Sequence, residues 1–145
     1  MGIDISDGAL ETARHNAVSL GVSKRAEFLK SDWTEKLQEQ FDLIITNPPY
    51  IAPGDYAGLP DAVRVYDPKR ALVAEEEGYG CYRLLSASIG PFLSSSGFLI
   101  VEAGDTMVKK IQDLFTLKGF VWRRNFPDLT GTPRALVFQK EEGYA

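Results

Sequence analysis

The sequence predicts an α/β fold built on a mostly parallel, doubly wound sheet. Short apolar runs typical of buried strands alternate along the chain with segments whose apolar residues recur at helical spacing. The last two apolar runs are joined by a short turn, which predicts an antiparallel pair at one edge of the sheet. With 145 residues, 44% of them hydrophobic and 25% charged, we expect one domain, or part of one, over residues 1–145.

The first third of the chain contains three predicted strands. In order, we expect a strand at 2–5, a helix from about Asp7, its N-cap, to Leu20, a strand near 26–29, a solvated helix at about 34–40 and a strand at 41–46. The last of these begins Phe-Asp-Leu-Ile-Ile, a nearly continuous apolar run that indicates burial on both faces. We therefore expect strand 41–46 in the middle of the sheet.

The remainder begins with residues 51–70, a long irregular segment rich in proline and glycine. Loops of this length inside a compact domain are usually functional. After it we expect a helix at 79–93, a buried strand at 97–104, a helix at 106–117 that Gly119 ends, and the two edge strands at 120–126 and 135–139.

Composition argues against several classes of partner. The net charge is −4 and no stretch concentrates Lys and Arg, so nucleic acid is not favoured. One cysteine, Cys81, and one histidine, His15, are too few for an intrachain disulfide or a tetrahedral zinc site, and we expect no metal. No apolar run approaches the roughly 20 residues that cross a bilayer. We expect a cytoplasmic protein with no membrane partner.

Residues 47–50, Asn-Pro-Pro-Tyr, follow the predicted strand 41–46 directly and give the strongest functional signal. Prolines cannot continue a sheet ladder, but they make a turn rigid. The Asn47 side-chain oxygen and the Pro48 carbonyl can accept the two N–H bonds of a planar amide or amino group, and Tyr50 can stack on it. Such a site orients a planar nitrogen for attack on an electrophile. The alternative is a proline-braced turn with a capping asparagine.

Two carboxylates at strand ends fit an electrophile that is a methyl donor with a ribose and an adenine. Asp4 ends the first predicted strand, where an acidic residue of a dinucleotide-type fold binds a ribose diol. Asp32 follows the second strand and could accept the adenine amino group, while Trp33 packs or supplies a backbone contact. An aspartate at a strand end is also a common cap or turn former, which leaves a structural role open.

Six segments, in the order of the sequence, resemble the catalytic domain of the HemK/PrmC family: GIDIS, SDW, FDLIITNPPYI, DPKRAL, LIVEAG and DLTGTPRAL. Members of that family are class I, Rossmann-like methyltransferases that use S-adenosyl-L-methionine. They modify the glutamine of the Gly-Gly-Gln motif in peptide chain release factors, the proteins of translation termination.

The resemblance implies a role for each residue of the motif. Asn47 and Pro48 would hold the glutamine amide, and Pro49 and Tyr50 would shape its pocket. The cofactor site would be lined by Asp4, Asp32, Trp33 and Asn47. S-adenosyl-L-methionine is the implied cofactor and a release factor the implied partner.

The chain departs from the family pattern at its start. The family's glycine-rich cofactor loop, with the first strand and helix of its sheet, should precede GIDIS and is missing. That strand lies in the family between the strand of Asp4 and the strand leading to Asn47. We therefore expect impaired activity of this chain alone, and a possible dimer through exposed sheet edges.

Three other interpretations stay open. A permuted cofactor loop could lie in ALVAEEEGYGCYRLL, where Gly78 and Gly80 precede a helix. The same Asn-Pro-Pro-Tyr chemistry would serve a methyltransferase of exocyclic amines of adenine or guanine in RNA or DNA. The third is a catalytically inactive remnant that still binds release factors.

Overall fold

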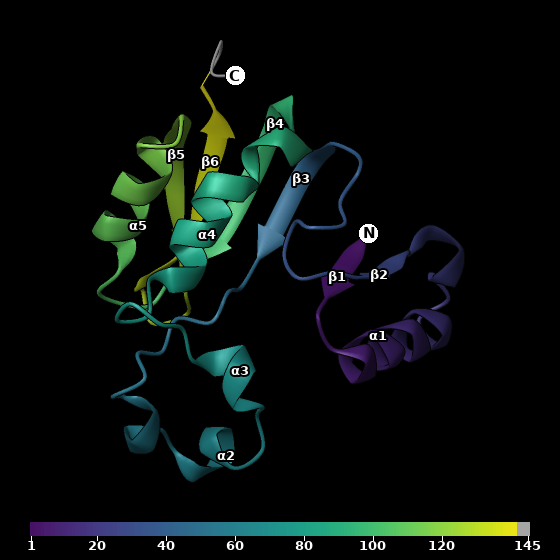
Figure 1. The fold of residues 1–145 in the computed structure, drawn as a ribbon, viewed down its shortest axis with the longest axis horizontal. Coiled ribbons are helices and arrows are strands. Elements are labelled where there is room, and N and C mark those ends of the chain that lie inside the picture. Colours follow the sequence, from purple (N-terminus) through teal and green to yellow (C-terminus); the bar gives the residue numbers. More distant parts are fainter. Residues whose placement is uncertain (142–145) are drawn as a thin grey trace. The chain divides into compact units, whose positions relative to one another are not determined.

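The computed structural model of the chain describes residues 1–141. The chain folds as two compact units, one of residues 1–39 and one that begins at Gln40. Each unit has its own β-sheet (Figure 1). The prediction of one partial domain over residues 1–145 stays a prediction.

The first unit is a strand–helix–strand motif. Strand β1 (Gly2–Asp4) and strand β2 (Phe28–Lys30) pair in parallel, and helix α1 (Asp7–Ser19) connects them. A 3₁₀ turn at Ser23–Arg25 follows the helix. The parallel pairing follows from the helical connection, because a crossover of this length returns the chain to the same end of the sheet.

The start of α1 differs from the prediction. The N-cap is Ser6, whose hydroxyl oxygen accepts a hydrogen bond from the Ala9 N–H at 3.3 Å, so the prediction of Asp7 was wrong. Asp7 is instead the first helical residue, and its carboxylate pairs with Lys30 at 2.5 Å. A serine at this position satisfies one of the free N–H groups of the first turn.

Residues 33–36 form a turn and residues 37–40 are irregular, so the predicted helix at about 34–40 was wrong. The Glu35 N–H donates to the Asp32 carbonyl and the Leu37 N–H to the Thr34 carbonyl, which are bonds over three residues rather than four. Seven mostly polar residues cannot repay the cost of helix nucleation without an apolar face to bury.

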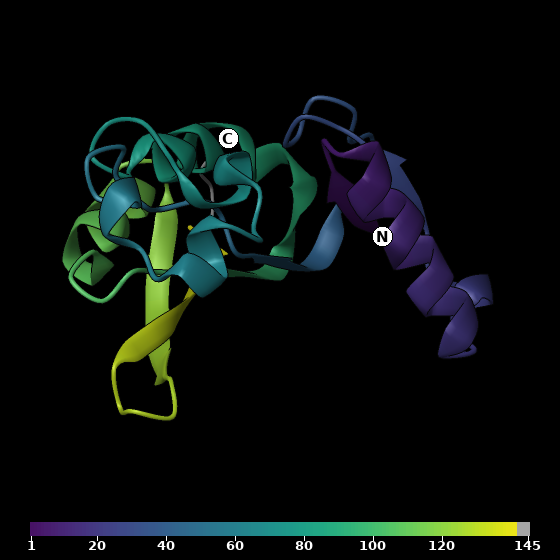
Figure 2. The same ribbon diagram turned by 90° about the horizontal axis from the view of Figure 1, so that it is seen from below.

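The second unit contains a four-stranded sheet in the order β3-β4-β6-β5 (Figure 1). The strands are β3 (Phe41–Thr46), β4 (Leu93–Glu102), β5 (Phe120–Pro127) and β6 (Pro133–Lys140). Strands β3 and β4 are parallel, whereas β6 is antiparallel to both of its neighbours. Figure 2 shows the β5–β6 hairpin with its connecting turn. The antiparallel edge pair is therefore confirmed.

Within residues 40–141, two main helices and four shorter ones accompany this sheet. The main helices are α4 (Gly80–Ser88) and α5 (Val108–Thr116), which contact each other. The shorter ones are Tyr56–Gly58, α2 (Asp61–Arg64), α3 (Lys69–Leu72) and Gly90–Phe92. None of the helices within residues 1–141 is long and apolar enough to cross a membrane.

The core of the second unit is formed by the sheet with helices α4 and α5. Leu99 and Val101 of β4 are fully buried two residues apart, as the period of a strand requires, whereas the consecutive residues 136–138 of β6 are all buried. The Phe115 ring of α5 stacks on Phe138 of β6 at 4.8 Å and meets Phe120 of β5 edge-on at 5.5 Å. This aromatic cluster fixes α5 on the antiparallel part of the sheet.

Two predictions for the second unit were wrong. Strand β3 has the predicted bounds, but it is an edge strand of its sheet, with Leu43 52% and Ile45 69% exposed. The predicted helix 79–93 ends at Ser88, because Pro91 lacks an N–H and disfavours helical backbone at the residue before it.

Candidate functional site

The Asn-Pro-Pro-Tyr segment begins one residue after β3 ends at Thr46. Asn47 is exposed, the Pro48 side chain is fully buried, and Pro49 and Tyr50 are half-buried. Within residues 1–141 the structure gives the Asn47 side chain no hydrogen-bond partner. Asn47 is therefore not a cap for the turn, and its amide is available to a ligand.

The DPKRAL segment holds the end of the motif by backbone pairing. The N–H groups of Tyr50 and Ile51 both donate to the Leu72 carbonyl, at 3.2 and 2.9 Å, and the Ala74 N–H donates to the Ile51 carbonyl at 3.0 Å. Ile51 and Val73 form a parallel bridge. Backbone hydrogen bonds therefore join the two ends of the long irregular segment next to the Asn-Pro-Pro-Tyr motif.

A left-handed turn packs against the same backbone. Glu76, Glu77 and Gly78 have φ values of +55°, +58° and +87°. A Cβ atom added to Gly78 would lie 2.2 Å from the Tyr50 carbonyl oxygen, so only glycine allows this approach. A Cβ on Gly80 would lie 3.2 Å from the Glu75 carbonyl oxygen. Close backbone packing explains both glycines, and the permuted cofactor loop gains no support.

Tyr50 lies in a cluster with Tyr82 of α4 and Glu102, the last residue of β4. The Tyr82 hydroxyl donates to the Glu102 carbonyl oxygen at 2.8 Å. Burial raises the pKa of the Tyr50 phenol, and the negative charge of Glu102 raises it further. Burial also raises the pKa of Tyr82, and the nearby Tyr50 phenol and the Glu102 charge raise it further. Both phenols are therefore neutral at physiological pH.

Arg134 of β6 joins two loops beside this cluster. Its guanidinium donates to the Ala103 carbonyl oxygen at 3.0 Å, to the Asp128 carboxylate at 3.1 Å and to Asp105. Asp128 in turn accepts from the Thr130 N–H and hydroxyl at 2.8 and 2.6 Å. The Thr130 hydrogen bonds, followed by those from Arg134 and the Thr132 N–H, lower the pKa of Asp128 to about 2.

Three of the four predicted cofactor residues, Asp4, Asp32 and Trp33, lie at one end of the paired strands β1 and β2, and the fourth, Asn47, lies in the second unit. Asp4 ends β1, and the Ser31 N–H donates to the Asp4 carbonyl at 3.1 Å, so Asp32 follows directly beyond the last paired residue. Both aspartates are exposed. One Asp4 carboxylate oxygen accepts the Ser6 N–H at 2.7 Å, and the Asp32 carboxylate has no hydrogen-bond partner in residues 1–141. Both carboxylates therefore lie at the carboxyl ends of paired strands.

Trp33 has an unusual backbone at this edge. Its φ is +46°, a conformation that a bulky residue rarely adopts. The buried Ser31 hydroxyl donates to the Trp33 carbonyl at 2.9 Å and accepts the Lys36 N–H at 3.1 Å, which holds the turn. Strained backbone of this kind is common at ligand sites.

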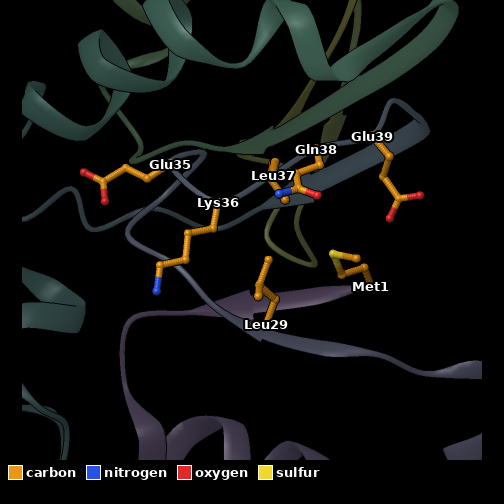
Figure 3. Close-up of a pocket in the computed structure, with 7 residues that line it drawn as sticks. All are labelled: Met1, Leu29, Glu35, Lys36, Leu37, Gln38 and Glu39. Atoms are coloured by element: carbon orange, nitrogen blue, oxygen red, sulfur yellow. The ribbon is translucent and has the colours of Figure 1, made fainter.

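A separate hollow of the first unit contains none of these residues. It is lined by Met1, Leu29, Glu35, Lys36, Leu37, Gln38 and Glu39 (Figure 3). Its walls mix acidic, basic and apolar side chains. Among residues 1–141, no three His, Cys, Asp or Glu side chains gather closely enough to hold a metal ion.

The roles assigned from the sequence to Asn47, Pro48, Pro49 and Tyr50, and to Asp4, Asp32 and Trp33, stay predictions. The first four are contiguous in the second unit and the other three share one edge of the first. Two residues around Tyr50, Tyr82 and Arg134, were given no role by the sequence analysis, and Gly78 was considered only as part of a permuted cofactor loop. The sequence offers one local signal near these residues. The spacing of Asp128, Thr130 and Thr132 is typical of an aspartate whose side chain caps its own turn.

A family model described as "Methyltransferase domain" matches residues 1–137. The chain belongs to this family. Its similarity extends to proteins named "Release factor glutamine methyltransferase", at 41% identity in Bradyrhizobium diazoefficiens and 37% in Rhodospirillum rubrum. The matched residues cover 97% of this chain, and 48% and 43% of the two relatives. This methyltransferase domain therefore spans about half the length of the curated relatives it matches.

Solved structures confirm the α/β, Rossmann-like fold of this methyltransferase domain. A ribosomal protein L11 methylase from Lactobacillus delbrueckii subsp. bulgaricus matches with a TM-score of 0.65 at 18% identity, covering 97% of this chain and 57% of that one. A methyltransferase from Pyrococcus furiosus matches with a TM-score of 0.66 at 16% identity, covering 96% and 61%. At these identities the likeness shows the fold alone, which here combines parallel and antiparallel strands.

Proposed function

We propose that this methyltransferase domain uses S-adenosyl-L-methionine to methylate a glutamine side-chain nitrogen in the Gly-Gly-Gln motif of peptide chain release factors. The observation that carries the proposal is the exposed, unpaired Asn47 amide at the start of a turn that Pro48 anchors in the core. The relatives named for this activity, at 37 to 41% identity, support the choice of substrate.

The chemistry of the motif follows from what a planar amide nitrogen needs. Its lone pair is delocalised, so both N–H bonds must be held for the lone pair to face the electrophile. The Asn47 side-chain oxygen accepts one N–H and the Pro48 carbonyl the other, while the neutral Tyr50 ring stacks on the amide. The cofactor, when bound, supplies the electrophilic methyl group. Orientation of this kind supplies several kcal/mol of a reaction barrier.

The cofactor contacts are assigned to the first unit. Asp4 would accept hydrogen bonds from the ribose hydroxyls and Asp32 from the adenine amino group. Both carboxylates are exposed, and they lie at the carboxyl ends of the paired strands β1 and β2. Trp33 would pack on the adenine or offer its backbone. With a release factor as substrate, the reaction would take place in the cytoplasm.

The test is a methyl-transfer assay with this chain, S-adenosyl-L-methionine and a release factor, read by mass spectrometry of the Gly-Gly-Gln peptide. We expect the methyl group on the glutamine, transferred slowly because the activity of this chain alone is expected to be impaired, and none when that glutamine is replaced. Methylation of RNA or DNA instead would support the exocyclic-amine alternative. Binding of the release factor without transfer would support the inactive remnant.

Asn47→Ala separates orientation from cofactor binding. We expect kcat to fall by about 100-fold, as for loss of one aligned polar contact in an active site, with little change in cofactor affinity. The matched control is Asn16→Ala on the exposed face of α1, which should leave both unchanged. Equal losses in turnover and cofactor affinity for Asn47→Ala would contradict the assignment.

A further inference from the structure

The loop that follows β4, residues 103–105, packs against the Tyr50 ring. A Cβ atom added to Gly104 would lie 3.3 Å from Cδ2 of Tyr50 and 2.8 Å from the Met107 sulfur. Ala103 and Gly104 are buried, whereas Asp105 is exposed. The ring therefore rests on bare backbone, and its position depends on where this loop is held.

Arg134 is the side chain that holds this loop. Its backbone carbonyl accepts the Ala103 N–H at 2.9 Å, and its guanidinium donates back to the Ala103 carbonyl at 3.0 Å and to the Asp105 side chain. Loop residues on both sides of Gly104 are thus bound to one guanidinium. A planar group with several donors fixes geometry in a way that a lysine ammonium cannot.

The opposite side of Arg134 is anchored to the β5–β6 turn. Asp128 accepts from its Nε at 3.3 Å and its Nη2 at 3.1 Å. The same carboxylate is fixed by the Thr132 N–H at 3.1 Å. Arg134 and Asp128 have side chains only 26% and 25% exposed, so this ion pair is better shielded from solvent than a typical surface pair. Arg134 therefore connects the β5–β6 turn to the loop of residues 103–105 that packs against Tyr50.

We infer that Arg134 is a positioning residue for Tyr50, acting through the Ala103–Asp105 loop. Its consequence for methyl transfer rests on the proposed function, in which Tyr50 stacks on the substrate amide. The electrostatics agree with this geometry. Burial and the Glu102 charge have the largest effects on the pKa of Tyr50; next, the Arg134 charge lowers it and the Asp105 charge raises it. Arg134 itself touches neither substrate nor cofactor in this role.

The first test is structural and needs no enzyme activity. Nuclear Overhauser effects between the Tyr50 ring and the Gly104 Hα protons are compared in the parent chain, Arg134→Gln and Arg134→Lys. We expect strong effects in the parent, loss in Arg134→Gln and partial retention in Arg134→Lys. The control is Arg123→Gln in the same hairpin, where the Arg123 side chain donates to Gln139 at 2.8 Å and the Tyr50 signals should not change. Unchanged signals in Arg134→Gln overturn the inference.

If Arg134→Gln does not fold, the same Tyr50–Gly104 effects are measured in Asp105→Asn. The Asp105 side chain is 65% exposed, so its replacement leaves the core intact. Weakened Tyr50–Gly104 effects in Asp105→Asn support the inference, and unchanged effects overturn it.

The second readout is kinetic. In Arg134→Lys we expect kcat for the release factor to fall by roughly 10-fold with KM nearly unchanged. A parent chain that transfers no methyl group refutes the proposed function but leaves the spectroscopic result valid.

Discussion

Gly78 packs on the Tyr50 backbone so closely that the residue at position 78 decides whether the motif can be formed. Its φ is +87°, and an added Cβ would lie 2.2 Å from the Tyr50 carbonyl oxygen and 3.0 Å from the carbonyl carbon. Both atoms are backbone and cannot turn away. We predict that Gly78→Ala lowers the free energy of unfolding by about 3 kcal/mol or more, measured by urea denaturation.

Two other glycines separate the causes of that loss. Gly131 also has a left-handed backbone, at +90°, but no atom within 4 Å of an added Cβ, so Gly131→Ala should cost only about 1 kcal/mol. Gly54 has neither constraint, and Gly54→Ala should be neutral within about 0.5 kcal/mol. Equal losses in Gly78→Ala and Gly131→Ala would mean that contact with Tyr50 is unimportant.

Asp128 makes stability depend on pH in the acid range. Hydrogen bonds from Thr130, with those from Arg134 and the Thr132 N–H, lower its pKa from 3.8 to about 2 in the folded state. A lowered pKa contributes stability that is complete above the unfolded value and is lost as the pH falls through the folded one. We predict that Asp128→Asn is less stable than the parent above pH 4, and that the difference closes toward pH 2.

Urea denaturation of both chains between pH 2 and pH 6 measures this difference. Thr130→Val removes the largest single cause of the low pKa, the hydroxyl bond at 2.6 Å, and should reduce the pH-dependent part. Parallel stability curves for the parent and Asp128→Asn would show that the carboxylate makes no such contribution.

At the scale of single residues, the sequence was informative where the chemistry is local. Two prolines after an aliphatic strand indicated a rigid turn, and the exposed Asn47 beside the buried Pro48 agrees with that. The role of Arg134 depends on Asp105, which lies 29 positions earlier in the chain. No spacing rule connects residues that meet only through sheet pairing, so this contact could not be predicted.

At the scale of elements, helix α1 depends on its N-cap more than a well-packed helix would. Only Leu10 and Ala17 of its residues are buried. We predict that Ser6→Ala, which removes the 3.3 Å bond to the Ala9 N–H, costs about 1 kcal/mol. Amide hydrogen exchange in the first turn of α1 measures it directly.

Ser19→Ala provides the control for α1, because Ser19 is the exposed last residue of the helix and caps nothing. We expect no change in exchange there. Faster exchange in Asp7→Ala but not in Ser6→Ala would instead restore Asp7 as the cap, as the sequence first suggested. In that case the Ser6 bond would contribute nothing.

Elements with a strong pattern were predicted better than those bounded by weak signals. Strand 41–46 has the predicted ends, and the α5 helix lies within the predicted 106–117. The predicted helix 34–40 lacked an apolar face, so only charge and propensity supported it. The burial of β3 was mispredicted because an apolar run indicates that both faces can be covered, not which strands pair with its edges.

At the scale of the whole molecule, the exposed edge of β3 is the feature with the largest consequence. The strand pairs on one side with β4, and within residues 1–141 no other strand pairs with it, so one row of its backbone donors and acceptors lacks a strand partner. Leu43 and Ile45 are 52% and 69% exposed along it. An edge that is both unpaired and apolar favours association with another copy of the chain.

We therefore predict that the chain forms dimers at concentrations of tens of micromolar, and that Ile45→Lys makes it monomeric. A lysine on an edge strand opposes pairing, because its charge would have to be buried in the new sheet. Sedimentation velocity over a range of concentrations measures both. Leu117→Lys, at a leucine 75% exposed just beyond α5, controls for charge and solubility. A parent chain that stays monomeric, or equal loss of dimer in both variants, would mean that the β3 edge does not drive association.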